Sequence, residues 1–209
     1  MNILLVDDHE IVRRGLKQLL AEEFPRAQFG EAARVPQARE LLAVQAWDLV
    51  LLDVSLPGGS GLELIPEARR LRPAPAVLVL SHYPEEAFAV RAFRLGAAGY
   101  LTKASVADEM FAAVKKVLAG GRYVSAALAV QLVAALGQPF AQEPHETLSL
   151  RELEVLRLVA TGQTIKEIAA GLALSEKTVA TYRARIAEKL ALRTNVDLAR
   201  YAMQHRLVE

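Results

Sequence analysis

The chain has 209 residues, of which 53% are apolar and 23% charged, with 25 basic residues, 24 acidic residues and no cysteine. This composition excludes a disordered chain, a disulfide framework, a thiolate metal site and a cysteine nucleophile. The net charge of +1 gives no global reason to expect nucleic acid as a partner, provided that the charge is evenly spread.

The apolar stretches predict a cytoplasmic protein without membrane contact. Residues 3–6 run into Asp7 and Asp8 with no basic segment before them, unlike a signal peptide. The longest uncharged stretch, residues 123–142, has an apolar part at 124–136 that contains Gln131. This part is too short to span a bilayer. We therefore expect a packed or linker helix near residues 124–136.

Short apolar runs alternate with helical patterns over the first 120 residues. Runs rich in Leu and Val suit strands buried on both faces of a parallel sheet, and they cover residues 3–6, 48–52 and 76–80. Weaker strand candidates are residues 28–32 and 99–101. Helical patterns follow at residues 11–22, 36–44, 62–71, 85–95 and 107–119. Five successive βα units predict a doubly wound α/β domain with helices on both faces of the sheet.

The last 60 or so residues contain no strand pattern and predict four helices. Ser149 with Glu152, and Thr164 with Glu167, match the capping box, and Ser175 and Thr194 suit the N-caps of the third and fourth helices. Two prolines and a glycine in residues 137–145 indicate a linker. We expect a first domain over residues 1–120, a linker over 121–147 and a small all-α domain over 148–209.

Polar residues follow the predicted strands of the first domain. Asp7 and Asp8 follow the first strand, Asp53 ends the third, Ser81 ends the fourth and Lys103 follows the fifth. The carboxyl ends of parallel strands meet at one edge of the sheet, where ligands bind. Taken singly, each residue is more often a cap, a turn residue or a solvated charge. Their occurrence in order at successive strand ends favours a shared site.

The chemistry of this set points to a divalent cation and a phosphoryl group. Three carboxylates without a cation would repel one another, and Mg²⁺ prefers such oxygen ligands. Three Asp, one Lys and one Mg²⁺ sum to zero charge. A carboxylate can serve as the nucleophile that forms an aspartyl phosphate, and a nearby hydroxyl and ammonium can then bind the phosphoryl oxygens.

Three segments resemble the receiver domain of bacterial two-component response regulators, which has a flavodoxin-like fold. They are LLVDDHEIVRRGL, DVSLPGGSG (residues 53–61, with Leu56 in place of the family's Met) and GAAGYLTK (96–103). The resemblance implies phosphorylation of Asp53 by a sensor histidine kinase. It implies Mg²⁺ ligands from Asp8, Asp53 and the Ser55 carbonyl, with Asp7 acting through water. Ser81, Lys103 and Tyr100 would respond to the phosphoryl group, although Tyr100 is equally compatible with simple core packing.

The charge is unevenly distributed. Residues 1–138 contain 15 basic and 15 acidic residues, whereas residues 177–206 contain seven basic and two acidic residues, a net of +5. The third predicted helix of the second domain bears several of these cations on one polar face. A basic helix is often only a solvated face, so this pattern alone does not decide for DNA binding.

Residues 148–190 closely resemble the LuxR-type DNA-binding domain of the NarL/FixJ regulators, which are helix-turn-helix proteins. Ile165 stands where Asn is common, and Tyr182 where His is common. Ala180, Thr181 and Ala184 occupy positions that often face bases, and such small side chains favour thymine methyl groups over guanine. We therefore expect strong dependence on phosphate contacts and DNA shape. The implied set of DNA-contacting residues is Thr164, Lys166, Ser175, Lys177, Thr178, Ala180, Thr181, Tyr182, Arg183, Ala184, Arg185 and Lys189.

The sequence predicts a transcriptional regulator that is not an enzyme, with double-stranded DNA and a kinase as partners. By resemblance, the last helix, residues 195–204, is also a homodimer contact. One alternative is an aspartate-nucleophile phosphohydrolase, but that enzyme would need a general acid where Ser55 stands. A second is a DNA-binding protein with a vestigial receiver, which the complete set of acidic, hydroxyl and lysine residues disfavours.

Overall fold

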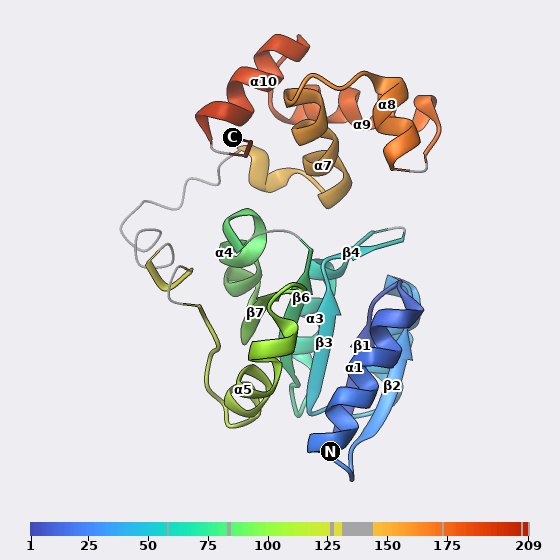
Figure 1. Cartoon of the computed structure of the whole chain (residues 1–209), viewed down its shortest axis with the longest axis vertical. Helices are drawn as coiled ribbons and strands as arrows, with labels where there is room; N and C mark the ends of the chain where they lie inside the picture. Colours follow the sequence, from blue (N-terminus) through green and yellow to red (C-terminus); the bar gives the residue numbers. More distant parts are fainter. Residues whose placement is uncertain are drawn as a thin grey trace. The chain divides into compact units, whose positions relative to one another are not determined.

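The computed structural model describes residues 1–57, 59–82, 85–125, 128–130, 144–172, 174–205 and 207–208. The chain divides into two compact units, Met1–Pro139 and Phe140–Glu209, which are described separately below. Figure 1 shows strands and helices together in the first unit and helices in the second.

The first unit is built on a five-stranded parallel sheet with the strand order β2-β1-β3-β6-β7. This is the flavodoxin-like order, in which the order of the strands along the sheet reverses between the first and the third strand. The predicted α/β class is therefore confirmed. The strands are β1 (Asn2–Val6), β2 (Gln28–Ala32), β3 (Leu49–Asp53), β6 (Ala76–Ser81) and β7 (Gly99–Thr102).

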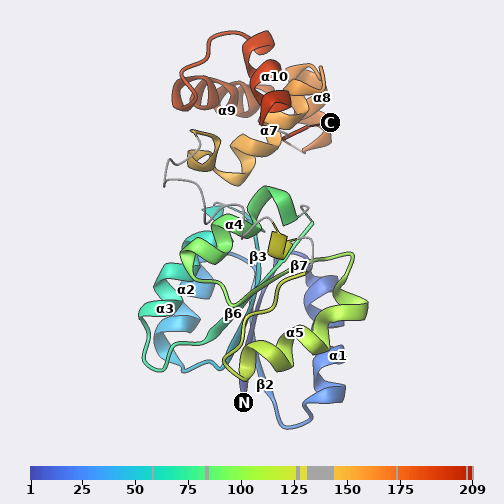
Figure 2. The same cartoon turned by 90° about the vertical axis from the view of Figure 1, so that its left-hand side faces the viewer.

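Helices cover both faces of this sheet, as Figure 2 shows. One apolar cluster joins alternate strand residues, such as Ile3, Leu51 and Leu78, to Leu20 and Val114 of the helices α1 and α5. The opposite face of the sheet packs beneath α2, α3 and α4. The helices are α1 (Glu10–Glu23), α2 (Val35–Val44), α3 (Leu64–Arg70), α4 (Glu85–Leu95) and α5 (Val106–Leu118). Each strand and helix expected within residues 1–120 is present, with ends that differ by at most two residues.

A short hairpin after β3 was not predicted. Its strands, β4 (Ser55–Leu56) and β5 (Gly59–Ser60), pair antiparallel and lead into a 3₁₀ turn, η1 (Gly61–Glu63). The helical pattern that begins at residue 62 therefore starts as a 3₁₀ turn before it continues as α3. The strands are two residues long, which is too short for alternation of apolar and polar residues to reveal them.

The second unit contains the four predicted helices, α7 (Leu150–Ala160), α8 (Ile165–Gly171), α9 (Glu176–Lys189) and α10 (Asn195–Gln204). The side chains of Ser149, Thr164, Ser175 and Thr194 accept hydrogen bonds from first-turn amides, as expected. The segment between α7 and α8 passes through Gly162 at φ 85°, which a residue without a Cβ adopts readily. A 3₁₀ turn, η2 (Pro144–Thr147), precedes α7.

The helix expected near residues 124–136 falls largely outside the described residues, although residues 128–130 are helical. Residues 126, 127 and 131–143 of the expected linker also lie outside them. Among the residues that the structure describes, no helix has the length and apolar character needed to cross a membrane.

Candidate functional site

The carboxyl edge of the sheet gathers the five strand-end residues predicted from the sequence. Asp7 follows β1, Asp53 is the last residue of β3, and both are 2% exposed. Ser81 closes β6 and is fully buried, and its carbonyl accepts a 2.7 Å hydrogen bond from the amide of Lys103. Asp8, next to Asp7, is exposed. The parallel pairing of β1, β3, β6 and β7 brings these residues to one edge.

The ammonium of Lys103 bridges the two buried carboxylates. Its Nζ lies 2.6 Å from Asp7 Oδ2 and donates a 2.8 Å hydrogen bond to Asp53 Oδ2. Burial raises the pKa of Asp53, and the opposing attraction of Lys103 does not cancel this increase. Burial alone would lower the pKa of Lys103, but Asp53 and Asp7 outweigh it, so the pKa of Lys103 is raised. The ammonium therefore stays charged between the carboxylates.

Four side chains form a cluster that could hold a metal ion: Asp7, Asp8, His9 and Asp53, with one donor atom of each within 4.8 Å of the others. Asp7 Oδ2 is buried and, apart from its ion pair with Lys103, accepts no hydrogen bond of good geometry from the described residues. Carboxylates gathered this closely fit a site for a divalent cation with hard oxygen ligands. The acidic pocket predicted from the sequence is thus present.

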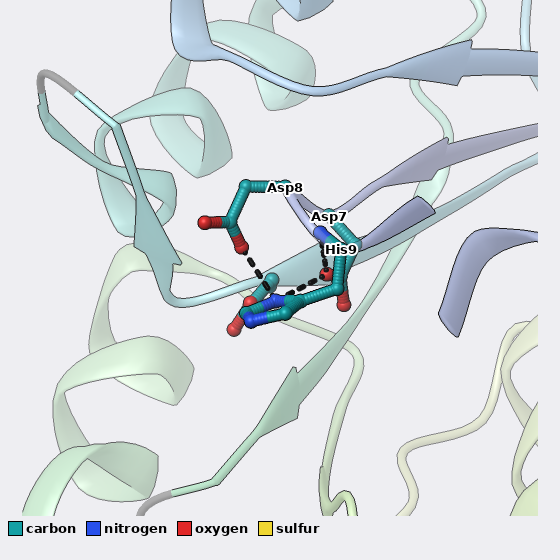
Figure 3. Close-up of side chains that lie close together, drawn as sticks. Asp7, Asp8 and His9 are labelled. Atoms are coloured by element: carbon teal, nitrogen blue, oxygen red, sulfur yellow. Dashed lines mark hydrogen bonds and ion pairs between the residues drawn. The ribbon is translucent and has the colours of Figure 1, made fainter. Parts of the chain in front are cut away.

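His9 is the member of this cluster that the sequence analysis missed. Its Nδ1 lies 2.8 Å from Asp8 Oδ1 and 3.3 Å from Asp7 Oδ1, and its backbone amide donates a 2.8 Å hydrogen bond to Asp7 Oδ1. Figure 3 shows the imidazole turned back toward both carboxylates. The feature of the sequence that could have identified His9 is its position directly after the acidic pair Asp7–Asp8.

The segment after Asp53 is shaped by close backbone contacts. The amide of Ser55 donates a 3.2 Å hydrogen bond to Asp53 Oδ1, and the amide of Gly61 donates one of 3.0 Å to the Val54 carbonyl. A Cβ at Gly61 would lie 1.9 Å from the Asp53 carbonyl oxygen. The lack of space for a Cβ therefore requires glycine at position 61, which explains the last glycine of the DVSLPGGSG segment.

Tyr100 is fully buried in β7. Strand β6 lies between β7 and β3, the strand that ends in Asp53. It pairs in register with Val79 of β6, while Ser81 pairs with Thr102. Core packing is sufficient to explain a tyrosine at this position. Its response to the phosphoryl group stays a prediction.

The second unit presents a helix-turn-helix made of α8 and α9. Its core contains Ile168, Ala169, Val179, Ile186 and Leu190, all of which are buried. Ile165, Leu172 and Leu174 are partly buried. The N-terminus of α9 is fixed by Ser175, whose Oγ accepts a 3.1 Å hydrogen bond from the Thr178 amide.

Most of the residues predicted to contact DNA lie on the solvent side of this unit. Five of them, Lys177, Thr178, Thr181, Tyr182 and Arg185, line one shallow surface hollow on α9. Of the remaining predicted residues, Arg183 is partly buried and six are exposed: Thr164, Lys166, Ser175, Ala180, Ala184 and Lys189.

Two of the predicted cations have partners inside the unit. Lys189 Nζ lies 2.6 Å from Oε2 of the buried Glu152 and donates to the Thr147 carbonyl at 3.3 Å. Arg183 donates 3.0 Å hydrogen bonds to Asn195 Oδ1 and to the Arg193 carbonyl. Both side chains brace α9 against neighbouring segments of the unit.

Comparison with known families decides the identity of both units. Residues 3–115, more than half of the chain, match the family model of the response regulator receiver domain. Residues 146–202 match that of the bacterial regulatory proteins of the luxR family. The chain is a response regulator.

Individual relatives match this chain over nearly their whole length. The response regulator GacA of Pseudomonas aeruginosa is 37% identical, with 100% of this chain and 98% of GacA covered. UvrY of Escherichia coli K12, also a response regulator, is 35% identical, with 99% and 95% covered. A structure of RcsB from Salmonella enterica serovar Typhimurium, bound to a promoter with the phosphomimetic BeF₃⁻, has a TM-score of 0.56 and 25% identity, with 96% and 97% covered. The NarL/FixJ-type organisation predicted from the sequence is confirmed.

Proposed function

We propose that phosphorylation of Asp53 by a sensor histidine kinase controls DNA binding by α9. The observation that carries this proposal is the buried Asp53 carboxylate, held 2.8 Å from Lys103 at the edge of the sheet, in the same chain as a helix-turn-helix with exposed cations. The receiver would comprise residues 1–120, the linker 121–147 and the DNA-binding domain 148–209. The division into units between Pro139 and Phe140 falls within that linker.

Phosphoryl transfer would form a P–O bond to an Asp53 carboxylate oxygen as the P–N bond of the kinase's phosphohistidine breaks. The electron pair of that bond returns to the imidazole of the kinase. Lys103, which already contacts Asp53, would then pair with a phosphoryl oxygen. The hydroxyl of Ser81 would bind another, and Tyr100 would follow Ser81. The added charge of about −1.5 to −2 is the signal that shifts the receiver between two states.

The acidic pocket fits Mg²⁺ by charge and by donor type. Asp8, Asp53 and the Ser55 carbonyl would be its ligands, with Asp7 acting through water. When bound, Mg²⁺ neutralises charge on the carboxylates and on the phosphoryl oxygens. Three Asp, one Lys and one Mg²⁺ leave no net charge before phosphorylation.

We place DNA against α9 because the hollow on this helix is lined by three hydroxyl-bearing side chains and two cations. Such a helix fits the major groove, with Lys177 and Arg185 on phosphates and the small side chains near bases. The RcsB complex with a promoter supports this placement by similarity. DNA binding would place the protein in the cytoplasm with the chromosome.

A homodimer would present two such helices to paired half-sites. Val196 and Met203 of α10 are 74% and 56% exposed, which supports α10 as the contact. Phosphorylation would favour this dimer.

The phosphorylation site is tested with a small phosphodonor, Mg²⁺ and mass spectrometry of wild type, Asp53→Asn and Asp108→Asn. Asp108 is an exposed carboxylate in the first turn of α5 and serves as the control. We expect one added phosphoryl group in wild type and Asp108→Asn and none in Asp53→Asn. Continued labelling of Asp53→Asn would refute the site, and catalytic turnover of a phosphate ester would favour the phosphohydrolase.

The DNA surface is tested by measuring affinity against salt concentration for Arg185→Ala and for Lys115→Ala, a receiver cation paired with Glu23. Loss of one phosphate contact reduces the magnitude of the slope of log K against log salt by about 1 and weakens binding to all sequences. We expect this for Arg185→Ala and not for Lys115→Ala. Equal slopes in both variants would remove Arg185 from the interface.

A further inference from the structure

The His9 side chain is turned toward the acidic pocket although it is largely exposed to solvent. Its side chain is 57% exposed, yet Nδ1 lies 2.8 Å from Asp8 Oδ1 and 3.3 Å from Asp7 Oδ1 (Figure 3). Its backbone amide is already bonded to Asp7 Oδ1, so the loop is held independently of the ring. The ring therefore adds a nitrogen donor at the mouth of the pocket.

The spacing of the donor atoms suits a single six-coordinate ion. Metal–ligand bonds of about 2.1 Å place neighbouring octahedral ligands about 3 Å apart and opposite ligands about 4.2 Å apart. The distances from His9 Nδ1 to Asp8 Oδ1 and Asp7 Oδ1 match neighbouring positions. The whole set, which includes Asp53, spans no more than 4.8 Å and needs only a small contraction around an ion.

His9 and Lys103 do not compete for the same oxygens. Lys103 contacts Oδ2 of Asp7 and Oδ2 of Asp53, whereas His9 contacts Oδ1 of Asp7 and Oδ1 of Asp8. An ion held at the Oδ1 side would leave the Lys103 bridge intact. The ammonium needed for the phosphoryl group and the imidazole can thus act together.

We propose that His9 is a nitrogen ligand of the receiver's metal site, so that this site binds first-row divalent transition ions such as Mn²⁺ more tightly than Mg²⁺. The inference rests on the proposed function in that it uses the same pocket. An imidazole nitrogen is a better ligand for first-row transition ions than for Mg²⁺, whereas carboxylate and water oxygens are good ligands for both. A nitrogen in place of one water therefore changes which ion the pocket selects.

The nitrogen ligand is tested with Mn²⁺ and the full-length protein. Electron spin echo modulation of bound Mn²⁺ detects a directly coordinated ¹⁴N. We expect ¹⁴N modulation in wild type, its replacement by ¹⁵N modulation in ¹⁵N-histidine protein, and its loss in His9→Gln. The control is His82→Gln. The His82 ring centroid lies 6.2 Å from that of His9, but His82 is not in the donor cluster, so the modulation should persist.

Affinity provides a second readout. We expect His9→Gln to lower Mn²⁺ affinity about tenfold or more, while Mg²⁺ affinity, measured by competition with Mn²⁺, changes much less. Phosphorylation of wild type at Asp53 is measured in parallel by mass spectrometry, so that failure of this inference is distinguished from failure of the proposed function. Absence of histidine modulation in wild type, or equal losses for both ions in His9→Gln, would overturn the proposal and leave His9 as an ion-pair partner of Asp8.

Discussion

The carboxyl group of Asp53 is 2% exposed, and its charged neighbours are Lys103 and Asp7. Burial disfavours its charged form, and one ammonium serves two carboxylates. The pocket is thus arranged for a reactive carboxylate and a cation, at the expense of the free energy of unfolding. Such a conflict between local stability and chemistry is expected at functional sites.

Replacing Asp53 by Asn should therefore stabilise the receiver at neutral pH in the absence of metal. The folded-state pKa of Asp53 is raised, so the folded chain binds more protons than the unfolded chain, and wild-type stability falls as pH rises through that pKa. The advantage of Asp53→Asn should grow over the same range and vanish below the unfolded-state pKa. Urea unfolding followed by Trp47 fluorescence measures it, because Trp47 is the one tryptophan and is buried in the first unit.

The control for this measurement is Asp108→Asn, which changes an exposed carboxylate. Its stability should stay within about 0.5 kcal/mol of wild type. A destabilised Asp53→Asn at neutral pH would show that the Lys103 contact outweighs the burial of the carboxylate.

Gly61 gives a second test at the residue scale. Gly61→Ala should destabilise the receiver by about 1–3 kcal/mol, because the new Cβ collides with the Asp53 carbonyl oxygen. Gly15→Ala is the matched control: Gly15 lies exposed within α1 with no atom within 4 Å of the added Cβ, so it should stabilise by about 0.5–1 kcal/mol. Trp47 fluorescence in urea again reports both, and equal effects would show that the loop relaxes around Gly61.

At the scale of elements, the start of α7 and the end of α9 are joined through Glu152. Its carboxylate accepts a 2.6 Å hydrogen bond from the Ser149 amide and lies 2.6 Å from Lys189 Nζ. Burial raises the pKa of Glu152, but Lys189 and Ser149 outweigh it and the pKa is lowered. One carboxylate thus closes the capping box and positions the helix that is proposed to contact DNA.

Glu152→Gln should consequently destabilise the second unit by about 1–2 kcal/mol at neutral pH, from loss of the cap and of the ion pair. Because the folded-state pKa is lowered, the contribution of Glu152 is complete above its unfolded-state pKa and is lost as pH falls through the folded-state value. The difference between variant and wild type should therefore shrink in acid. Helical circular dichroism during urea unfolding measures it.

Glu154→Gln is the comparison, because Glu154 pairs with Arg151 on the surface of α7. Surface pairs contribute about 0–1 kcal/mol. A loss in Glu152→Gln no larger than in Glu154→Gln would show that the α7–α9 connection does not depend on this carboxylate.

Over the whole molecule, the sequence predicts the elements and the site to different extents. Three of the strands could be predicted because leucine- and valine-rich runs end beside Asp7, at Asp53 and at Ser81, whereas the strand before Lys103 gave a weaker pattern. The β4–β5 hairpin could not, since its two-residue strands carry no periodicity. His9 was missed because its role depends on the rotation of one side chain, and the partners of Lys189 were missed because a basic helical face does not show which cations pair within the unit.

The uneven charge along the chain takes a clearer meaning from the structure. The net of +1 averages a receiver with three carboxylates at one edge of the sheet and a helical unit with exposed cations, two of which, Lys177 and Arg185, lie on α9. The relevant charge is local to each unit. Coupling between them must pass through a change in the receiver that alters the state of the second unit.

The central claim is that phosphorylation at Asp53 controls DNA binding, and genome-wide DNA capture with wild-type and Asp53→Ala proteins tests it most directly. Both proteins are incubated with Mg²⁺ and a phosphodonor before capture. The account predicts that wild type enriches discrete promoter sites and that Asp53→Ala loses about tenfold or more of this enrichment, as expected for a typical coupling between sites. Equal enrichment of the same sites by both folded proteins would contradict it.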